Sequence, residues 1–140
     1  MANFGCNCTK SLIPGLKCCL TMEKWLSLVF CKGKPFDPTT PEYMRLHSFY
    51  IQNFDQERSR IHEAQILKDL HRTFPTVAYF QKDRPGNEAL QEILMMYSVY
   101  DNDECGYVQG MNFTAGMLAF HSTPNIAFCI FVKLLEDYSL

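Results

Sequence analysis

Apolar residues in this 140-residue chain recur mostly at intervals of three and four, the spacing of one face of an α-helix. Alternating apolar and polar runs long enough for paired strands are absent from the sequence. The pattern therefore predicts an all-α fold of about six helices. The first is expected over residues 20–30 with Thr21 as its cap, and the second starts at Pro41 after a cap at Thr40 or Thr39.

The later helices are bounded by similar signals. A third helix is expected over residues 59–72, and Pro75 would stop it. Asn87 is expected to cap a fourth, the fifth begins near Tyr107, and Pro124 opens the sixth. No glycine or proline ends the sixth helix, so we expect the apolar faces of the last two helices to need partners outside the chain.

Composition narrows the classes of protein that fit. An apolar content of 47% is ample for a packed core, and a net charge of −2 lacks the basic excess of a nucleic-acid binder. The apolar run at 126–132 is much shorter than the roughly 20 residues of a membrane span. The first twenty residues lack a secretory signal pattern, and Ala2 excludes N-myristoylation. We expect a cytoplasmic chain with no nucleic-acid partner and no direct membrane insertion.

The seven cysteines are an odd number, which argues against a fully paired disulfide framework and favours free thiols in a reducing compartment. Their spacing near the N-terminus, C-x-C followed by C-C, differs from common structural zinc patterns, and the first forty residues contain no histidine. Zinc binding and reversible acylation are weaker alternatives for this region. Its cysteines are Cys6, Cys8, Cys18, Cys19 and Cys31.

The segment 101–112 begins like a calcium-binding EF-hand loop, D-x-D-x-x-G. Cys105 stands at the fifth position of that loop and Asn112 at the twelfth, where the bidentate glutamate is required. Two missing ligands favour a polar turn, with Gly106 in a backbone conformation that other residues avoid.

Two polar groups are candidates for chemistry. Asp69 and Arg72 lie three apart on the third predicted helix, so they can pair and fix the direction of the guanidinium beside a buried Ile66. Gln109 lies at the opening of an apolar helix, where its amide could orient water. The simpler alternatives are a cation favoured by the helix dipole and an amide that satisfies free backbone N–H groups.

These segments resemble the TBC domains, which are GTPase-activating proteins for Rab GTPases. Residues 66–75, I-x-x-D-x-x-R-T-F-P, are similar to the arginine-finger motif of that family. Residues 107–112, Y-x-Q-G-M-N, are similar to its glutamine-finger motif, and the pattern between the two also predicts a joining helix. The resemblance covers about residues 60–138.

The resemblance implies roles for individual residues. Arg72 would stabilise charge on the γ-phosphoryl group of GTP bound to a Rab, and Gln109 would position the attacking water. Asp69 would orient Arg72, and Tyr107 would shape the backbone around Gln109. GTP and Mg²⁺ would belong to the partner, so the chain would need no cofactor and would have no independent catalytic activity. A Rab partner also implies a role in vesicle trafficking, with recruitment to the cytosolic face of endomembranes.

The N-terminal part departs from the family pattern. Members carry an arginine about one turn before a tryptophan, whereas Thr21 and Met22 stand at that distance before Trp25 here. TBC domains are also considerably longer. We therefore expect residues 1–35 to form a Cys-rich segment with a divergent first helix, and residues 36–140 to form the N-terminal part of a TBC domain, truncated at the C-terminus.

Three functional hypotheses follow: a Rab GTPase activator, a non-catalytic Rab-binding or truncated regulatory helical module, and a plain helical structural module. In the third, the pair of Asp69 and Arg72 is a surface salt bridge worth less than about 1 kcal/mol. The substitution Arg72→Ala separates the first two, because only an activator has stimulated hydrolysis to lose.

Overall fold

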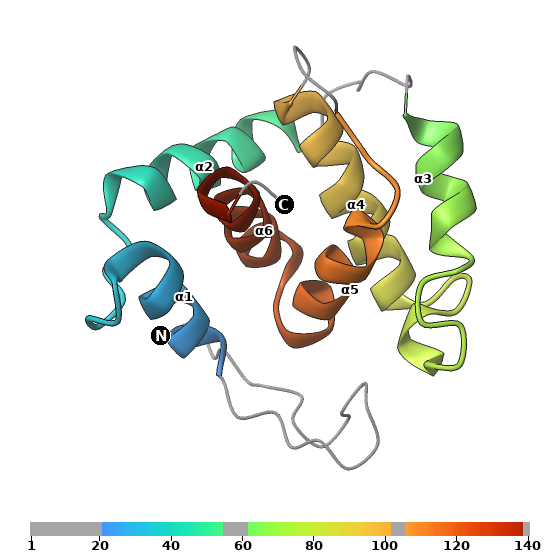
Figure 1. Cartoon of the computed structure of the whole chain (residues 1–140), viewed down its shortest axis with the longest axis horizontal. Coiled ribbons are helices and arrows are strands. Elements are labelled where there is room, and N and C mark those ends of the chain that lie inside the picture. Colours follow the sequence, from blue (N-terminus) through green and yellow to red (C-terminus); the bar gives the residue numbers. More distant parts are fainter. Residues whose placement is uncertain (1–20, 55–61, 102–105, 139–140) are drawn as a thin grey trace.

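The computed structural model describes residues 21–54, 62–101 and 106–138, and within these ranges the chain is helical without strands (Figure 1). The predicted all-α fold is therefore confirmed. The elements in chain order are α1 (Met22–Cys31), α2 (Pro41–Asn53), α3 (Glu63–Leu70), the 3-10 helix η2 (Ala78–Phe80), α4 (Pro85–Tyr100), α5 (Met111–His121) and α6 (Pro124–Tyr138).

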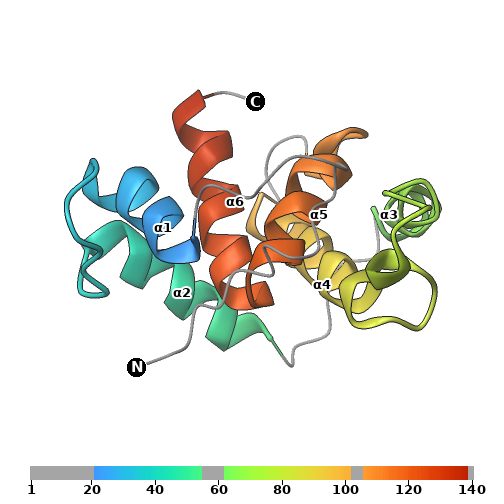
Figure 2. The same cartoon turned by 90° about the horizontal axis from the view of Figure 1, so that it is seen from below.

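Helix α6 is the centre of the arrangement, and it packs against α1, α2, α4 and α5 (Figures 1 and 2). Every residue from Ile126 to Val132 is buried, because this stretch is apolar on all sides and helices of the same chain surround it. The expectation that α6 needs an outside partner is wrong for this stretch.

Helix α3 lies at one edge of the molecule, where it packs against α4 and α5. Helices α1 and α2 lie on the opposite side of α6 (Figure 2). This arrangement leaves the segment that follows α3 at the edge of the fold, next to the segment that leads into α5.

The predicted starts of the first two helices agree with the structure. The Thr21 hydroxyl accepts a hydrogen bond from the Lys24 N–H at 3.3 Å, which satisfies one of the free N–H groups of α1. Pro41 is the first residue of α2, and Thr40 rather than Thr39 occupies the cap position.

The predicted cap of α4 is wrong. The helix begins at Pro85 with Arg84 in the cap position, since a proline is well suited to the first helical turn. Asn87 lies inside that turn, and its amide donates to the Phe80 carbonyl at 3.4 Å. Its polar side chain therefore links α4 to the preceding η2 and does not cap the helix.

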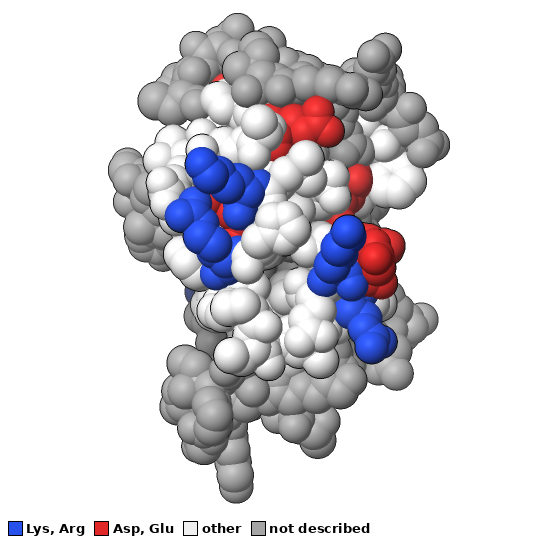
Figure 3. Space-filling model, turned by 90° about the vertical axis from the view of Figure 1, so that its right-hand side faces the viewer, with Lys and Arg blue, Asp and Glu red and all other residues white. Residues whose placement is uncertain are grey.

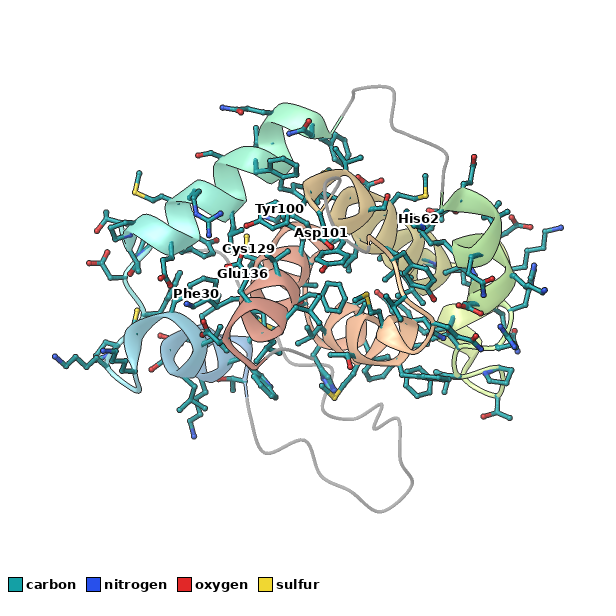
Figure 4. The ribbon with its side chains drawn as sticks, turned by 45° about the horizontal axis from the view of Figure 1, so that its top comes forward. Phe30, His62, Tyr100, Asp101, Cys129 and Glu136 are labelled. Carbon is teal, nitrogen blue, oxygen red and sulfur yellow. The ribbon has the colours of Figure 1, made fainter. Side chains whose placement is uncertain are left out.

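A cluster of three polar side chains joins α2, α4 and α6 at the surface, and two of them, Tyr100 and Glu136, are labelled in Figure 4. The Tyr100 hydroxyl donates to Glu136 at 2.5 Å and accepts from the Arg45 guanidinium at 2.7 Å. Arg45 also forms a salt bridge to Glu136 at 3.4 Å. We call this set the Glu136 triad.

Cys31 and Cys129 are free thiols, and the other cysteines lie outside the described residues. Cys129 is buried in α6, and burial raises the pKa of its thiol to about 12, which keeps the group uncharged. None of the helices in the described ranges is long and apolar enough to span a bilayer.

Candidate functional site

Arg72 lies in the turn after α3. The sequence pattern predicts a helix as far as residue 72, and that prediction is wrong. The helix ends at Leu70, and the Arg72 N–H bonds the Asp69 carbonyl at 3.0 Å in a tighter, 3-10-like turn. Phe74 then takes a left-handed backbone conformation with φ +45°, and Pro75 follows. These two residues cannot continue a helix, so the arginine is presented from a turn.

Asp69 holds that arginine from a buried position. Its side chain is 1% exposed and accepts from the Arg72 guanidinium, whereas the Arg72 side chain is 53% exposed. Gln65 donates a second hydrogen bond to the same carboxylate at 3.1 Å. The predicted pairing is therefore confirmed, and the guanidinium is anchored at one end while it faces solvent at the other.

Tyr107 provides a contact that sequence analysis missed. Its hydroxyl donates to the second Asp69 oxygen at 2.5 Å, across 38 residues of chain. Burial and the neighbouring carboxylate both raise the pKa of Tyr107, so the hydroxyl keeps its proton as a donor. Asp69, Arg72 and Tyr107 form what we call the Asp69 triad. The expected role of Tyr107 in shaping the backbone around Gln109 stays a prediction.

The ionisation of Asp69 reflects two opposing effects. Burial alone would raise its pKa, since a charge is disfavoured away from water. Hydrogen bonds from Tyr107, Gln65 and Arg72 outweigh burial and hold the pKa below its usual range. The carboxylate is therefore charged at neutral pH and can accept all three donors.

Gln109 lies in a tight turn before α5, so the predicted helix start near Tyr107 is wrong. Helix α5 begins at Met111, whose N–H bonds the Val108 carbonyl at 3.1 Å and closes the turn. Gly110 has φ +105°, a conformation that no helix contains and that glycine adopts without strain. Gln109 is exposed at the corner of this turn.

A second link joins the two turns through side chains that sequence analysis did not assign to the site. The Asn112 amide donates to the Thr73 hydroxyl at 2.8 Å, and both residues are buried. The sequence contained a signal for this bond, because Thr73 and Asn112 are polar residues inside the two motifs. Periodicity alone gave no means of pairing residues 39 positions apart.

The described residues of the segment that begins like a calcium loop bond to other groups of the chain. Gly106 donates its N–H to the Asp101 carboxylate at 3.0 Å, and its φ is +61°, as expected for a polar turn. Asn112, at the twelfth position of the supposed loop, turns toward Thr73. The described residues contain no group of three or more His, Cys, Asp or Glu side chains placed to hold a metal ion.

Figure 3 views the molecule from the right-hand side of Figure 1, where α3 lies. Basic side chains form two separate groups with acidic side chains beside them, and uncharged residues lie between. The described part of this face is thus not a continuous basic surface.

The geometry combines two complementary groups at one edge of the fold. Arg72 is a half-exposed guanidinium with a fixed anchor, suited to an anionic oxygen that carries several acceptors. Gln109 is an exposed amide that can both donate to and accept from a water molecule. The hydrogen bond between Asp69 and Tyr107 links the turn that carries Arg72 to the turn that carries Gln109. Such a site can stabilise negative charge and orient water on a bound partner.

Comparison with known proteins identifies the family. The family model for the Rab-GTPase-TBC domain matches residues 17–140, which is most of the chain. The chain therefore belongs to the Rab-GTPase-TBC domain family, as the two finger-like motifs predicted.

Several curated relatives match the chain over part of its length. It is 40% identical over 79 residues to the Rab GTPase-activating protein tbc-11 of Caenorhabditis elegans, covering 56% of this chain and 8% of that protein. It is 42% identical over 79 residues to the human ecotropic viral integration site 5 protein homolog, covering 56% and 10%. Identity to the Rab GTPase-activating protein eat-17 of C. elegans is 34% over 95 residues, covering 68% and 10%. The chain thus spans a tenth or less of these proteins.

Proposed function

We propose that this chain stimulates GTP hydrolysis by a Rab-family GTPase and supplies Arg72 and Gln109 to the nucleotide site of its partner. The observation that carries the proposal is the Asp69 carboxylate, which is buried and binds both Arg72 and Tyr107. One anchor thereby serves both turns. The family, and relatives named as Rab GTPase-activating proteins, support the choice of partner.

Arg72 would act on charge that develops during hydrolysis. The planar guanidinium can contact several oxygens of the transferring γ-phosphoryl group while Asp69 holds its other side. An arginine supplied in this way accelerates small GTPases by roughly 10³–10⁵. Because the anchor is already formed, little of this stabilisation is spent on ordering the side chain.

Gln109 would orient the attacking water with its amide oxygen and nitrogen. The hydrogen bond from the Met111 N–H to the Val108 carbonyl fixes the backbone of the turn that carries Gln109. The Gln109 side chain is exposed. GTP and Mg²⁺ would be held by the partner, and no residue of this chain is assigned to a cofactor. The chain would thus act only by completing a site on another protein.

The test is single-turnover hydrolysis by a panel of purified Rab GTPases loaded with GTP, with and without the chain. We expect at least one Rab to be accelerated, and Arg72→Ala and Gln109→Ala each to remove most of the effect. Arg45→Ala, in the Glu136 triad, is the control and should retain it. Circular dichroism confirms that each variant is folded.

Two outcomes would overturn the proposal. If a folded parent chain accelerates no Rab but binds one in its GTP form, the alternative of a non-catalytic Rab-binding module stands. Acceleration that survives both substitutions would show that Arg72 and Gln109 are not the groups responsible.

Activity on a Rab would place the chain in vesicle trafficking, in the cytoplasm and at the cytosolic face of endomembranes. The division into a segment 1–35 and an N-terminal part of a longer domain over 36–140 stays a prediction.

A further inference from the structure

We propose that Thr73 and Asn112 are positioning residues for GTPase activation, because their hydrogen bond sets the arginine-bearing turn against the glutamine-bearing turn. This inference rests on the proposed function and adds residues to its site. Neither side chain is exposed enough to contact a partner, since Thr73 is 1% and Asn112 is 2% exposed. We therefore assign them an effect on the maximal rate that acts through Arg72 and Gln109.

Asn112 uses both ends of its amide. Its nitrogen donates to the Thr73 hydroxyl at 2.8 Å, and its oxygen accepts the Gly110 N–H at 3.1 Å. Gly110 directly follows Gln109 and has the left-handed φ of +105° that gives the turn its shape. One buried side chain therefore holds the glutamine turn and reaches the arginine turn.

Thr73 completes the link from the other side. Its hydroxyl donates to the Asp69 carbonyl at 2.8 Å and accepts from Asn112, so both its donor and an acceptor site are used. The same Asp69 carbonyl also accepts the Arg72 N–H at 3.0 Å, so it serves as a shared acceptor at the end of α3. Thr73 directly follows Arg72, and the chain of bonds thus runs from the end of α3 to the turn of Gln109.

Two links between the same pair of turns do more than either alone. The bond from Tyr107 to Asp69 fixes one point, about which the turns could still rotate. The bond from Asn112 to Thr73 lies on the far side of Arg72 and Gln109 in the sequence and removes that freedom. Catalytic groups need this control, because a displacement of about 1 Å can cost roughly a hundredfold in rate.

Close packing supports the second link. A Cβ added at Gly116 of α5 would come within 3.1 Å of the Thr73 methyl group and 3.2 Å of the Phe74 ring. The absence of a side chain there lets the arginine turn lie directly against α5. The Phe74 ring is also held edge-on by Phe113, with centroids 5.9 Å apart.

The test uses a matched pair of variants at one position. Thr73→Val keeps the shape and removes the hydroxyl, whereas Thr73→Ser keeps the hydroxyl. Hydrolysis of GTP by a responsive Rab is measured under single-turnover conditions over a range of activator concentrations. We expect Thr73→Val to lower the maximal rate by roughly tenfold to a hundredfold with the half-maximal concentration unchanged. Thr73→Ser should retain most of the parent's rate.

A double-substitution cycle tests whether the bond is the cause. If Thr73 and Asn112 act through their hydrogen bond, Thr73→Val with Asn112→Ala should be little worse than the more damaging single change. If Thr73→Val does not fold, Asn112→Ala still tests the bond because it removes the donor. Thr73→Ser still tests whether the hydroxyl is sufficient for activity.

The failures are distinguishable. A parent chain that accelerates no Rab overturns the proposed function and this inference together. A parent that depends on Arg72 but is matched by Thr73→Val overturns this inference alone. So does a Thr73→Val variant whose half-maximal concentration rises while its maximal rate is kept, because that result indicates weaker docking or a smaller folded fraction.

Discussion

The described part of the chain contains two clusters of the same three kinds of side chain, an arginine, a carboxylate and a tyrosine, in different surroundings. In the Glu136 triad both charged side chains are open to water, with Arg45 53% and Glu136 40% exposed. In the Asp69 triad the arginine is equally exposed at 53%, but the carboxylate is 1% exposed.

The difference in burial separates a surface contact from a built site. Exposed ion pairs are screened by water and add little to stability. A buried carboxylate must instead be satisfied by donors, and Asp69 has three of them from two distant segments. Its hydrogen bonds therefore link the two motifs. The Glu136 triad joins helices that already pack against one another.

The largest contrast is expected for lysine at the two arginine positions. Arg72→Lys should lose most of the stimulated hydrolysis, because a single ammonium cannot contact both Asp69 and several phosphoryl oxygens. Arg45→Lys should retain it. Single-turnover rates with one responsive Rab decide between them, and equal rates for the two variants would contradict the assigned role of Arg72.

The next contrast concerns folding stability. Asp69→Asn should lower the free energy of unfolding by about 1.5–3 kcal/mol, since hydrogen bonds to a buried charged group are lost or become mismatched. Glu136→Gln should cost less than about 1 kcal/mol. Urea denaturation of both variants measures the difference, and a larger loss at Glu136 would reverse our view of the two triads.

The smallest expected effect is on acid sensitivity. Because the fold holds the pKa of Asp69 below its usual range, its contribution to stability is present above the unfolded-state value near 4 and is lost as the pH falls through the folded-state value. The parent should therefore lose more unfolding free energy than Asp69→Asn between about pH 5 and pH 3. Urea titrations across that range would show parallel losses if Asp69 were not responsible.

Sequence patterns found the helices but placed the end of α3 and the start of α5 wrongly. Arg72 was assigned to a helix because apolar spacing continues to Leu70 and Pro75 is the first obvious stop. The positive φ of Phe74 has no sequence signal, since bulky residues rarely adopt it. The glycine at 110 was visible, yet a glycine alone does not show whether it caps a helix or shapes a turn.

The candidate site was predicted in its parts, but most of its connections were not. Motif resemblance gave Arg72, Gln109, Asp69 and Tyr107, and local spacing gave the pairing of Asp69 with Arg72. The bonds from Tyr107 to Asp69 and from Asn112 to Thr73 join residues 38 and 39 positions apart, on either side of η2 and α4. The packing of α3 against α4 and α5 brings these residues together, and periodicity does not predict that packing.

The most direct test of this account compares phenylalanine at the two tyrosines. Single-turnover hydrolysis by a responsive Rab is measured with the parent chain, Tyr107→Phe and Tyr100→Phe, each removing one hydroxyl that binds a carboxylate. We predict a clear loss of stimulated rate for Tyr107→Phe and none for Tyr100→Phe. Equal rates for all three, or no stimulation by the folded parent, would contradict the claim that the Asp69 triad holds a GTPase-activating site.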